Sequence, residues 1–427
     1  PQLSVAARSL DGTAARTSNE LLTYRLAVAA TYEYNQKVAA GNVVNTQAEI
    51  VTAINRVNEI YERDLGIFLQ LVANNDQLIA TDSNDGLTNN YAGALIDESG
   101  PYIDGIIGNS AYDIGHVFST GAGGLAQLQS VCGLFKADGV TGRPNPTGDS
   151  YYIDYVAHEI GHQFGANHTF NGTSGSCDIA RNGATSYEPG SGSTIMAYAG
   201  ICGAENLQNN SDATFHAGSI AQIIYFSRSG GGSSCANVST TGNTAPDADA
   251  GSDYTIPKLT PFVLSGSATD SDGDSLSYQW DEMDLGVETD SGTLLSDLNT
   301  NPLFRSFRPY SSPKRTLPKM DDILAGVTKT GEVLPEFVRT MNFRLTVRDQ
   351  SGGVDEDNMK VIVEQDAGPF ETITASSSPV TIDVLQPQVI EWDVACTDAA
   401  PVDCDYVDIT LSTNGGTTFP TTLISST

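Results

Sequence analysis

Hydrophobic and polar positions in the first part of the chain alternate between the period of a strand and that of a helix. Residues 21–35 are rich in aromatic and aliphatic side chains, and part of this stretch alternates as a strand does. Residues 45–66 repeat apolar side chains at a helical period and end at Gly66, which predicts a helix. Residues 67–73 form a second short apolar run. A strand, a helix and a strand in this order predict a right-handed βαβ unit.

The pattern then continues with one more strand and two helices around a long irregular stretch. Residues 113–120 predict a strand. Residues 149–165 place apolar side chains on one stripe and end at a glycine, which predicts a buried helix. Residues 171–213 are rich in Gly, Asn, Ser and Thr, so regular structure is expected to be sparse there. Residues 214–229 resume a helical period.

The pattern changes beyond a stretch of small and polar residues that is typical of a linker. Alternating strands broken by Asp/Gly turns follow, which indicates an antiparallel β-sandwich. We therefore predict an α+β domain over 1–240, in which residues before about position 20 are an extension. A linker over 241–246, a β-sandwich over 247–366 and a partial second sandwich over 367–427 complete the prediction.

The charge of the chain excludes some classes of partner. Its 52 acidic and 21 basic residues give a net charge of −31. Such a surface repels phosphate backbones and anionic lipid, so we expect no nucleic-acid and no membrane partner. No run of eighteen apolar residues exists that could span a bilayer. We expect a monomer. The chain begins at Pro1 without an initiator methionine, so we expect it to be a processed or trimmed piece of a longer protein.

The six cysteines are scattered and form no close CxxC pair of the zinc-ribbon or redox type. An even number of scattered cysteines in an acidic, lysine-poor chain favours disulfides and export, so we expect a secreted, extracellular protein. Six cysteines allow fifteen pairings, and their spacing alone does not choose among them.

Three of the five histidines fall within one stretch, HEIGHQFGANH, at 158–168. His158 and His162 are four residues apart, so on a helix they project from the same face and can both bind one zinc ion. Glu159 is rotated by roughly 100° from His158, which brings its carboxylate beside the metal without making it a ligand.

A glycine between the second and third histidines supports a third ligand. Gly165 can adopt a positive φ, which ends the helix and turns the chain so that His168 returns to the metal. Three protein ligands leave one position for water, which is the arrangement of a catalytic zinc and not of a structural one. The alternative is a helix with ordinary core or surface histidines.

At these residues the chain resembles the metzincin metalloproteases, whose signature is HExxHxxGxxH followed by a methionine-containing turn. The stretch GSGSTIMAYAGICG supplies that turn, and Met196 would be the apolar floor beneath the imidazoles. Within the clan, HEIGHQFGANHTFNG and YEPGSGSTIMAYAGICG are most similar to bacterial reprolysin-like (M12B-like) proteases. The resemblance covers roughly residues 20–240 and implies an upper half with a twisted mixed sheet and helices, and an irregular lower half that carries the turn.

Two positions depart from the reprolysin pattern. Thr169 stands where the family usually has Asp after the third histidine, and Tyr198 stands two residues after Met196. That tyrosine spacing resembles astacins and serralysins instead. The Tyr198 phenol would lie near the zinc, as a ligand or as a donor to the developing oxyanion, or the residue would form the wall of a specificity pocket. The sequence leaves both roles open.

The resemblance also implies two disulfides, Cys132–Cys235 and Cys177–Cys202. Cys396 and Cys404 are eight residues apart within one module and are expected to pair locally.

The remaining candidates are weaker. We expect His116, on a strand, and His216, on a helix, to be packed structural residues. The acidic stretch DSDGD at 270–274 could hold a structural calcium ion, but it lacks the later glutamate of an EF-hand, so a polar turn is preferred. The context of that stretch resembles PKD- or cadherin-like modules of bacterial exoenzymes.

These observations predict a secreted zinc metalloendopeptidase that hydrolyses peptide bonds of extracellular proteins. Glu159 would take a proton from the zinc-bound water and deliver it to the leaving amine. The protein or peptide substrate would lie extended along a glycine-rich sheet edge at 119–128. We expect residues 1–240 to suffice for hydrolysis. The alternative is a surface adhesion or carbohydrate-binding protein whose sandwich modules carry the main role, although the intact Glu159 argues against it.

Overall fold

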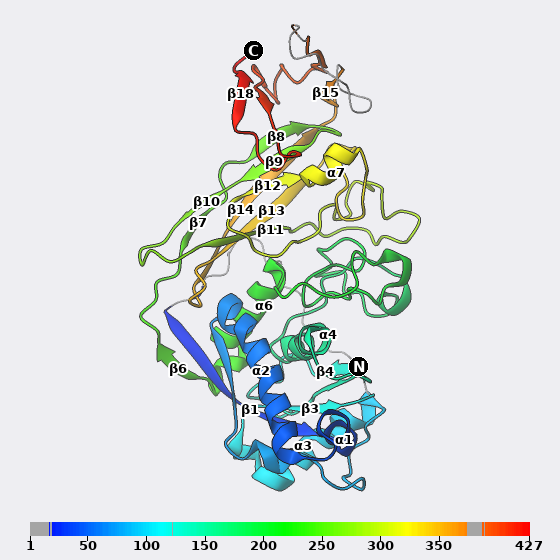
Figure 1. The fold of residues 1–427 in the computed structure, drawn as a ribbon, viewed down its shortest axis with the longest axis vertical. Helices are drawn as coiled ribbons and strands as arrows, with labels where there is room; N and C mark the ends of the chain where they lie inside the picture. Colours follow the sequence, from blue (N-terminus) through cyan, green and yellow to red (C-terminus); the bar gives the residue numbers. More distant parts are fainter. Residues whose placement is uncertain (1–16, 18, 122, 374–386, 388) are drawn as a thin grey trace.

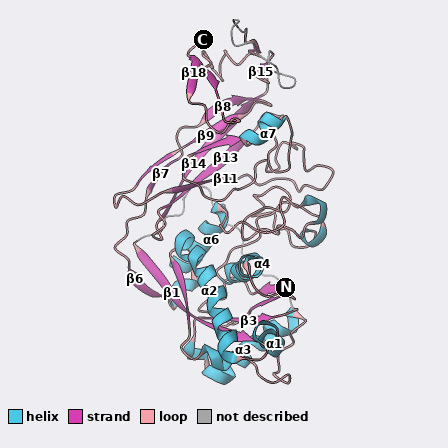
Figure 2. Ribbon diagram, in the orientation of Figure 1, coloured by secondary structure: helices cyan, strands magenta, loops and turns pink. Residues whose placement is uncertain are grey.

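The computed structural model describes residues 17, 19–121, 123–373, 387 and 389–427. The chain up to residue 240 is called the first half here, and the chain from residue 247 onward the second half. The two halves occupy opposite ends of an elongated molecule (Figure 1). Helices gather in the first half, whereas the second half consists mainly of strands and loops (Figure 2). Among the described residues, no helix is both long and apolar enough to cross a membrane.

The first half is built on a mixed sheet with strand order β2-β1-β3-β5-β4. β1 is parallel to β2 and to β3, β3 is parallel to β5, and β4 is antiparallel to β5 at one edge. The parallel pairing of β1 and β2 confirms the strand–helix–strand order predicted from the periodicity. The strands are β1 (Glu20–Ala30), β2 (Ile67–Leu71), β3 (Ile114–Ser119), β4 (Gly123–Ala126), β5 (Gly139–Gly142) and β6 (Asn237–Thr240), of which β6 pairs with β1.

The first predicted strand and helix have different bounds in the structure. β1 ends at Ala30, because Thr31 accepts a hydrogen bond from the backbone N–H of Tyr34 and caps a short helix. The long helix begins earlier than predicted, with Asn42 as its cap in place of Asn45 or Thr46, and the Asn42 side chain accepts from Asn45 N–H. The helices of the first half are α1 (Tyr32–Ala39), α2 (Val43–Leu65), α3 (Ala92–Ile107), α4 (Asp149–Tyr151), α5 (His158–Gln163) and α6 (Ala217–Arg228).

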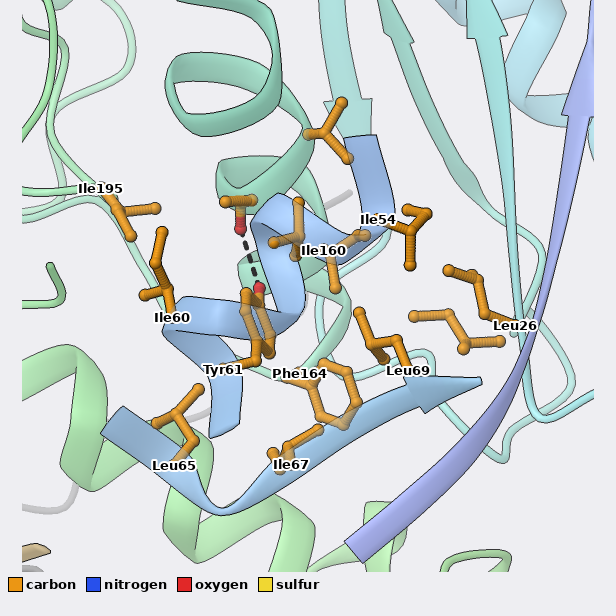
Figure 3. Close-up of a cluster of buried hydrophobic side chains, with 14 of the residues drawn as sticks. Leu26, Ile54, Ile60, Tyr61, Leu65, Ile67, Leu69, Ile160, Phe164 and Ile195 are labelled. Atoms are coloured by element: carbon orange, nitrogen blue, oxygen red, sulfur yellow. Dashed lines mark hydrogen bonds between the residues drawn. The ribbon is translucent and has the colours of Figure 1, made fainter. Parts of the chain in front are cut away.

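The predicted helix over 149–165 consists of α4, a π-helical segment at Tyr152–Ala157 and α5. It packs against α2 in a common core (Figure 3), where the Tyr61 hydroxyl donates a hydrogen bond to the Ala157 carbonyl at 2.8 Å. Ile160 and Phe164 lie in the same buried cluster as Tyr61. The metal-motif helix is therefore fixed on its inner side by aliphatic and aromatic packing, which leaves its other side for chemistry.

The second half has a hydrophobic core of its own, centred on the buried Trp280 and Phe343. Its largest sheet has the order β11-β13-β14-β8, with β8 parallel to β14 and the other pairs antiparallel. The elements are β7 (Asp247–Asp249), β8 (Tyr254–Pro257), β9 (Phe262–Ser265), β10 (Ser267–Thr269), β11 (Ser277–Glu282), β12 (Lys314–Leu317), α7 (Met320–Ala325), β13 (Thr340–Arg348) and β14 (Val354–Glu364). The division into sandwich modules remains a prediction.

The last part of the chain contains two short antiparallel pairs. These are β15 (Glu371–Thr372) with β16 (Trp392–Asp393), and β17 (Ile409–Leu411) with β18 (Thr421–Ile424). The beginning of the strand-like stretch predicted there, from 380 to 386, lies outside the described residues.

Candidate metal centre

The structure brings the three motif histidines together. His158 and His162 lie on α5, and Gly165 adopts a φ of +95° where the chain turns toward His168. One ring nitrogen from each of the three lies within 4.8 Å of the other two. Among the described residues, this is the one group of His, Cys, Asp and Glu side chains that is placed to hold a metal ion.

Each histidine is oriented by a backbone carbonyl behind it. A carbonyl oxygen can only accept, so each Nδ1 carries the proton and each Nε2 keeps a lone pair. The three contacts, all at 2.7 Å, are His158 Nδ1 to Ile195 O, His162 Nδ1 to Ala166 O and His168 Nδ1 to Ala180 O. This is the arrangement in which the outer nitrogen fixes the ring and the inner nitrogen binds a metal.

The donor set fits a cation. The Nε2 atoms of His162 and His168 lie 3.1 Å apart, and with both protons on Nδ1 neither nitrogen can donate to the other. A shared cation would relieve the repulsion between these lone pairs. Burial lowers the pKa of His162 to about 4, and burial together with the His162 charge lowers that of His168 to about 3. Both rings are neutral at pH 7, which is the form that ligates zinc.

Glu159 is buried between the motif helix and the edge strand β4. A Cβ added at Gly124 would collide with Glu159 Oε1, so only glycine leaves room for the carboxyl. Burial raises the pKa of Glu159 to about 8. β4 is paired on one side only, with β5, within the described sheet, so its other edge is open to an extended peptide.

Met196 lies in the core directly under the motif helix. It is fully buried, and a Cβ at Gly161 would collide with its sulfur, so this glycine allows the turn to approach the helix closely. The Met196 carbonyl also accepts a hydrogen bond from Thr169 N–H at 3.2 Å. The turn is therefore attached both to the helix and to the residue after His168.

Tyr198 lies beside two of the three histidines. Its ring centroid is 4.5 Å from that of His168 and 5.6 Å from that of His158, and its ring stacks on Phe170 at 4.7 Å. Burial raises the pKa of its phenol, and the Glu159 carboxyl adds to the rise. The position agrees with both roles expected from the sequence.

Glu188 is a buried residue that the sequence analysis did not single out. Its carboxylate accepts hydrogen bonds from Thr169 Oγ1 at 2.6 Å, from Ser193 N–H at 2.7 Å and from Thr194 N–H at 3.1 Å. It thereby ties the residue after His168 to the start of the methionine turn. Thr169, one of the two departures from the reprolysin pattern, donates its hydroxyl hydrogen bond to this carboxylate. The sequence offered one signal for this role: Glu188 is a single acidic residue in a stretch of Gly, Ser and Tyr.

The two other histidines are packed, as expected. His116 is fully buried, with Nδ1 3.0 Å from Gln163 Oε1 and Nε2 2.7 Å from Thr141 Oγ1. Burial lowers its pKa to about 4. His216 caps α6 by accepting from Gly218 N–H and stacks on Tyr187 with ring centroids 5.2 Å apart. Neither belongs to the metal-binding group.

The structure contains two disulfides, Cys132–Cys235 and Cys177–Cys202, which are the two pairs that the resemblance implies. The prediction of a disulfide between Cys396 and Cys404 is wrong, because both cysteines are free and exposed in this structure. The Cys404 thiol donates instead to the Tyr406 carbonyl at 3.5 Å, and exposure means that no packing forces the two sulfurs together.

The acidic stretch 270–274 forms a polar turn. Asp270 Oδ1 accepts from the backbone N–H groups of Asp272, Gly273 and Asp274 at 2.8–3.1 Å. No metal-binding group includes these residues, so the described part of the chain gives calcium no support.

Comparison with known protein families gives a match over the first part of the chain. Residues 21–226 match the model of the metallo-peptidase family M12B, reprolysin-like. This range runs from β1 into α6 and contains every residue of the metal centre. The match and the histidine triad together support a reprolysin-like metalloprotease. No curated protein matches the sequence.

Proposed function

From the reprolysin-like match over 21–226, we propose that this chain is a secreted zinc endopeptidase of extracellular proteins. The observation that carries the proposal is the convergence of three Nε2 atoms whose Nδ1 partners are all backbone carbonyls. Two disulfides in the first half support an oxidising, extracellular location.

His158, His162 and His168 would hold the zinc ion, which when bound lowers the pKa of a water molecule and polarises the scissile carbonyl. Glu159, which is buried against β4, would take the proton of that water and pass it to the leaving amine. The open edge of β4 would bind the substrate backbone in an extended form. Met196 would form the apolar floor of the centre, and Tyr198 would interact with the substrate or with the metal.

The proposal is tested by hydrolysis of casein and of short peptides by the full chain. We expect a strong chelator to abolish cleavage and added zinc to restore it. Sequencing the products separates an endopeptidase, which cuts internal bonds, from an exopeptidase. A zinc-loaded, folded chain that cuts neither casein nor a diverse peptide library would refute the proposal.

A further inference from the structure

The second half of the chain contacts the first half directly behind the metal centre, at two separate places. The first place is the loop 170–181, three of whose side chains donate hydrogen bonds to backbone carbonyls of the segment 286–289. These bonds are Asn171 Nδ2 to Val287 O (2.9 Å), Arg181 Nη2 to Gly286 O (3.0 Å) and Thr173 Oγ1 to Thr289 O (3.2 Å). The segment 286–289 lies outside the part of the chain that matches the protease family.

This loop orients the third histidine. Ala180 O accepts the hydrogen bond from His168 Nδ1, and the Phe170 ring lies 5.2 Å from the His168 ring. Each of these residues is followed in the chain by one that the segment 286–289 holds, Asn171 after Phe170 and Arg181 after Ala180. The only helical element of the loop is a short 3-10 turn at Gly175–Cys177, so its position depends on tethers. Within the first half these are the Cys177–Cys202 disulfide and the Glu205 carboxylate, which accepts from the backbone N–H groups of Thr173 and Ser174, and the segment 286–289 adds the three bonds above.

The second place lies behind the first histidine. Ile195 O accepts from His158 Nδ1, and Ile195 N–H donates to Thr214 O at 3.0 Å. The Thr214 hydroxyl donates to Gln279 Oε1 at 2.8 Å.

Gln279 also holds the neighbour of Thr214. Its Nε2 donates to Phe215 O at 3.1 Å, and Arg348 Nη2 lies 3.3 Å from Thr214 Oγ1 as a further donor. Gln279, Thr214 and Arg348 are all fully buried. Gln279 on β11 and Arg348 on β13 both belong to the second half.

We infer that the second half of the chain is a positioning part of the metal centre, through the segment 286–289 behind His168 and through Gln279 behind His158. The orientation of a ligating imidazole depends on the partner of its second nitrogen. Here all three partners are loop carbonyls, and the second half contacts the segments behind two of them, Ile195 and Ala180. A loop carbonyl keeps its place only if the loop is itself held. This inference rests on the proposed metal centre, and it argues against the expectation that residues 1–240 suffice for hydrolysis.

The interface also has contacts far from the histidines, which provide a matched control. Thr17 Oγ1 donates to Gly352 O at 3.0 Å and accepts from Val354 N–H at 2.7 Å. Thr17 is buried, as Gln279 is. Thr17→Val and Gln279→Met therefore each replace a buried polar group with an apolar one of similar size. Val354 pairs with Arg348 in the sheet, but in the described structure neither Gly352 nor Val354 has a backbone hydrogen bond to Ile195 or Ala180, whose carbonyls orient His158 and His168.

The test compares Gln279→Met, Arg181→Met and the control Thr17→Val in the full chain. The zinc dissociation constant is measured by competition with a chromophoric chelator, and ligand geometry is read from the visible absorption of the cobalt-loaded chain. We expect Gln279→Met and Arg181→Met each to weaken zinc binding by up to about tenfold, the lower end of the effect of losing a direct outer partner of a metal ligand, because each residue holds the segment that carries such a partner. Their cobalt spectra should change, and those of Thr17→Val should match the parent.

Unchanged zinc affinity and an unchanged cobalt spectrum in a folded Gln279→Met or Arg181→Met chain would overturn the inference. An equal loss in Thr17→Val would also overturn it, because the effect would then be one of general stability. Arg181 is only partly buried, so its variant keeps the test decisive if Gln279→Met does not fold. A parent chain that binds zinc but cleaves no peptide would refute the proposed function and leave this inference standing.

Discussion

Arg348 Nε donates a hydrogen bond to Asp64 Oδ1 at 2.7 Å, and both side chains are fully buried although 284 residues separate them. Asp64 is near the end of α2 in the first half, and Arg348 ends β13 in the second. Asp64 also accepts from Arg63 Nε at 2.7 Å and from Phe215 N–H at 3.1 Å. The two halves are thus joined by a buried ion pair and not by a linker alone.

The first prediction is that Arg348→Met lowers the free energy of unfolding by about 3 kcal/mol, because removing one partner leaves a buried carboxylate with less compensation. Chemical denaturation of the full chain measures the loss. Arg308→Met is the control, since Arg308 pairs with Asp212 but its own side chain is 69% exposed, and exposed pairs contribute about 1 kcal/mol or less. Similar losses in both variants would contradict the prediction.

The same ion pair predicts an acid sensitivity. Burial alone would raise the pKa of Asp64, but the Arg348 and Arg63 guanidiniums outweigh burial and lower the pKa to about 2. A carboxyl whose pKa is depressed in the folded state stabilises the fold above its unfolded pKa, and this stabilisation is lost as the pH falls through the folded pKa. Unfolding measured from pH 5 to pH 2 should show this loss. Asp64→Asn should flatten it, and an unaltered slope in that variant would assign the loss to other groups.

The second prediction concerns Glu159. Glu159→Gln keeps the volume of the side chain and removes the proton acceptor, so we expect kcat to fall by about 10²–10⁴-fold. The zinc content should stay at the parent level, because the three histidines are unchanged. Peptide hydrolysis and atomic absorption on the same sample measure the two quantities. A variant that retains a large fraction of activity would exclude Glu159 as the general base.

The third prediction concerns Gly124, whose missing side chain leaves room for the Glu159 carboxyl. Gly124→Ala should displace that carboxyl and reduce kcat by at least tenfold, without loss of zinc. Gly105→Ala in α3 is the matched control, since a Cβ there would meet no atom within 4 Å. Parent-like kcat in a folded Gly124→Ala chain would show that the carboxyl can move without cost to the reaction.

The fourth prediction separates the two roles of Tyr198. Tyr198→Phe keeps the ring that packs on Phe170 and His168 and removes only the hydroxyl. If the phenol stabilises the developing oxyanion, kcat falls by about 10²-fold with little change in KM, since one such donor contributes about 2.7–4 kcal/mol. We expect this result. A change in KM and in side-chain preference with kcat intact would instead make Tyr198 a pocket wall.

Local chemistry determined the metal motif from the sequence alone. The four-residue spacing of His158 and His162, the place of Glu159 beside them and the glycine before His168 all act within a few residues, where helix geometry relates sequence to space. The strand–helix–strand order at the start of the chain was readable for the same reason. The ends of these strands and helices were harder to predict from the sequence, because a single side chain such as Thr31 decides where a strand stops and a helix begins.

Only the tertiary structure decided what holds the motif in place. The carbonyls of Ile195 and Ala180 carry no side-chain signal, so their contacts with His158 and His168 could not be read from residue types. The pairing of Asp64 with Arg348 depends on how two separate cores meet, and a linker of small polar residues predicted independence instead. Long-range contacts follow from the packing of whole elements, which periodicity within one element does not encode.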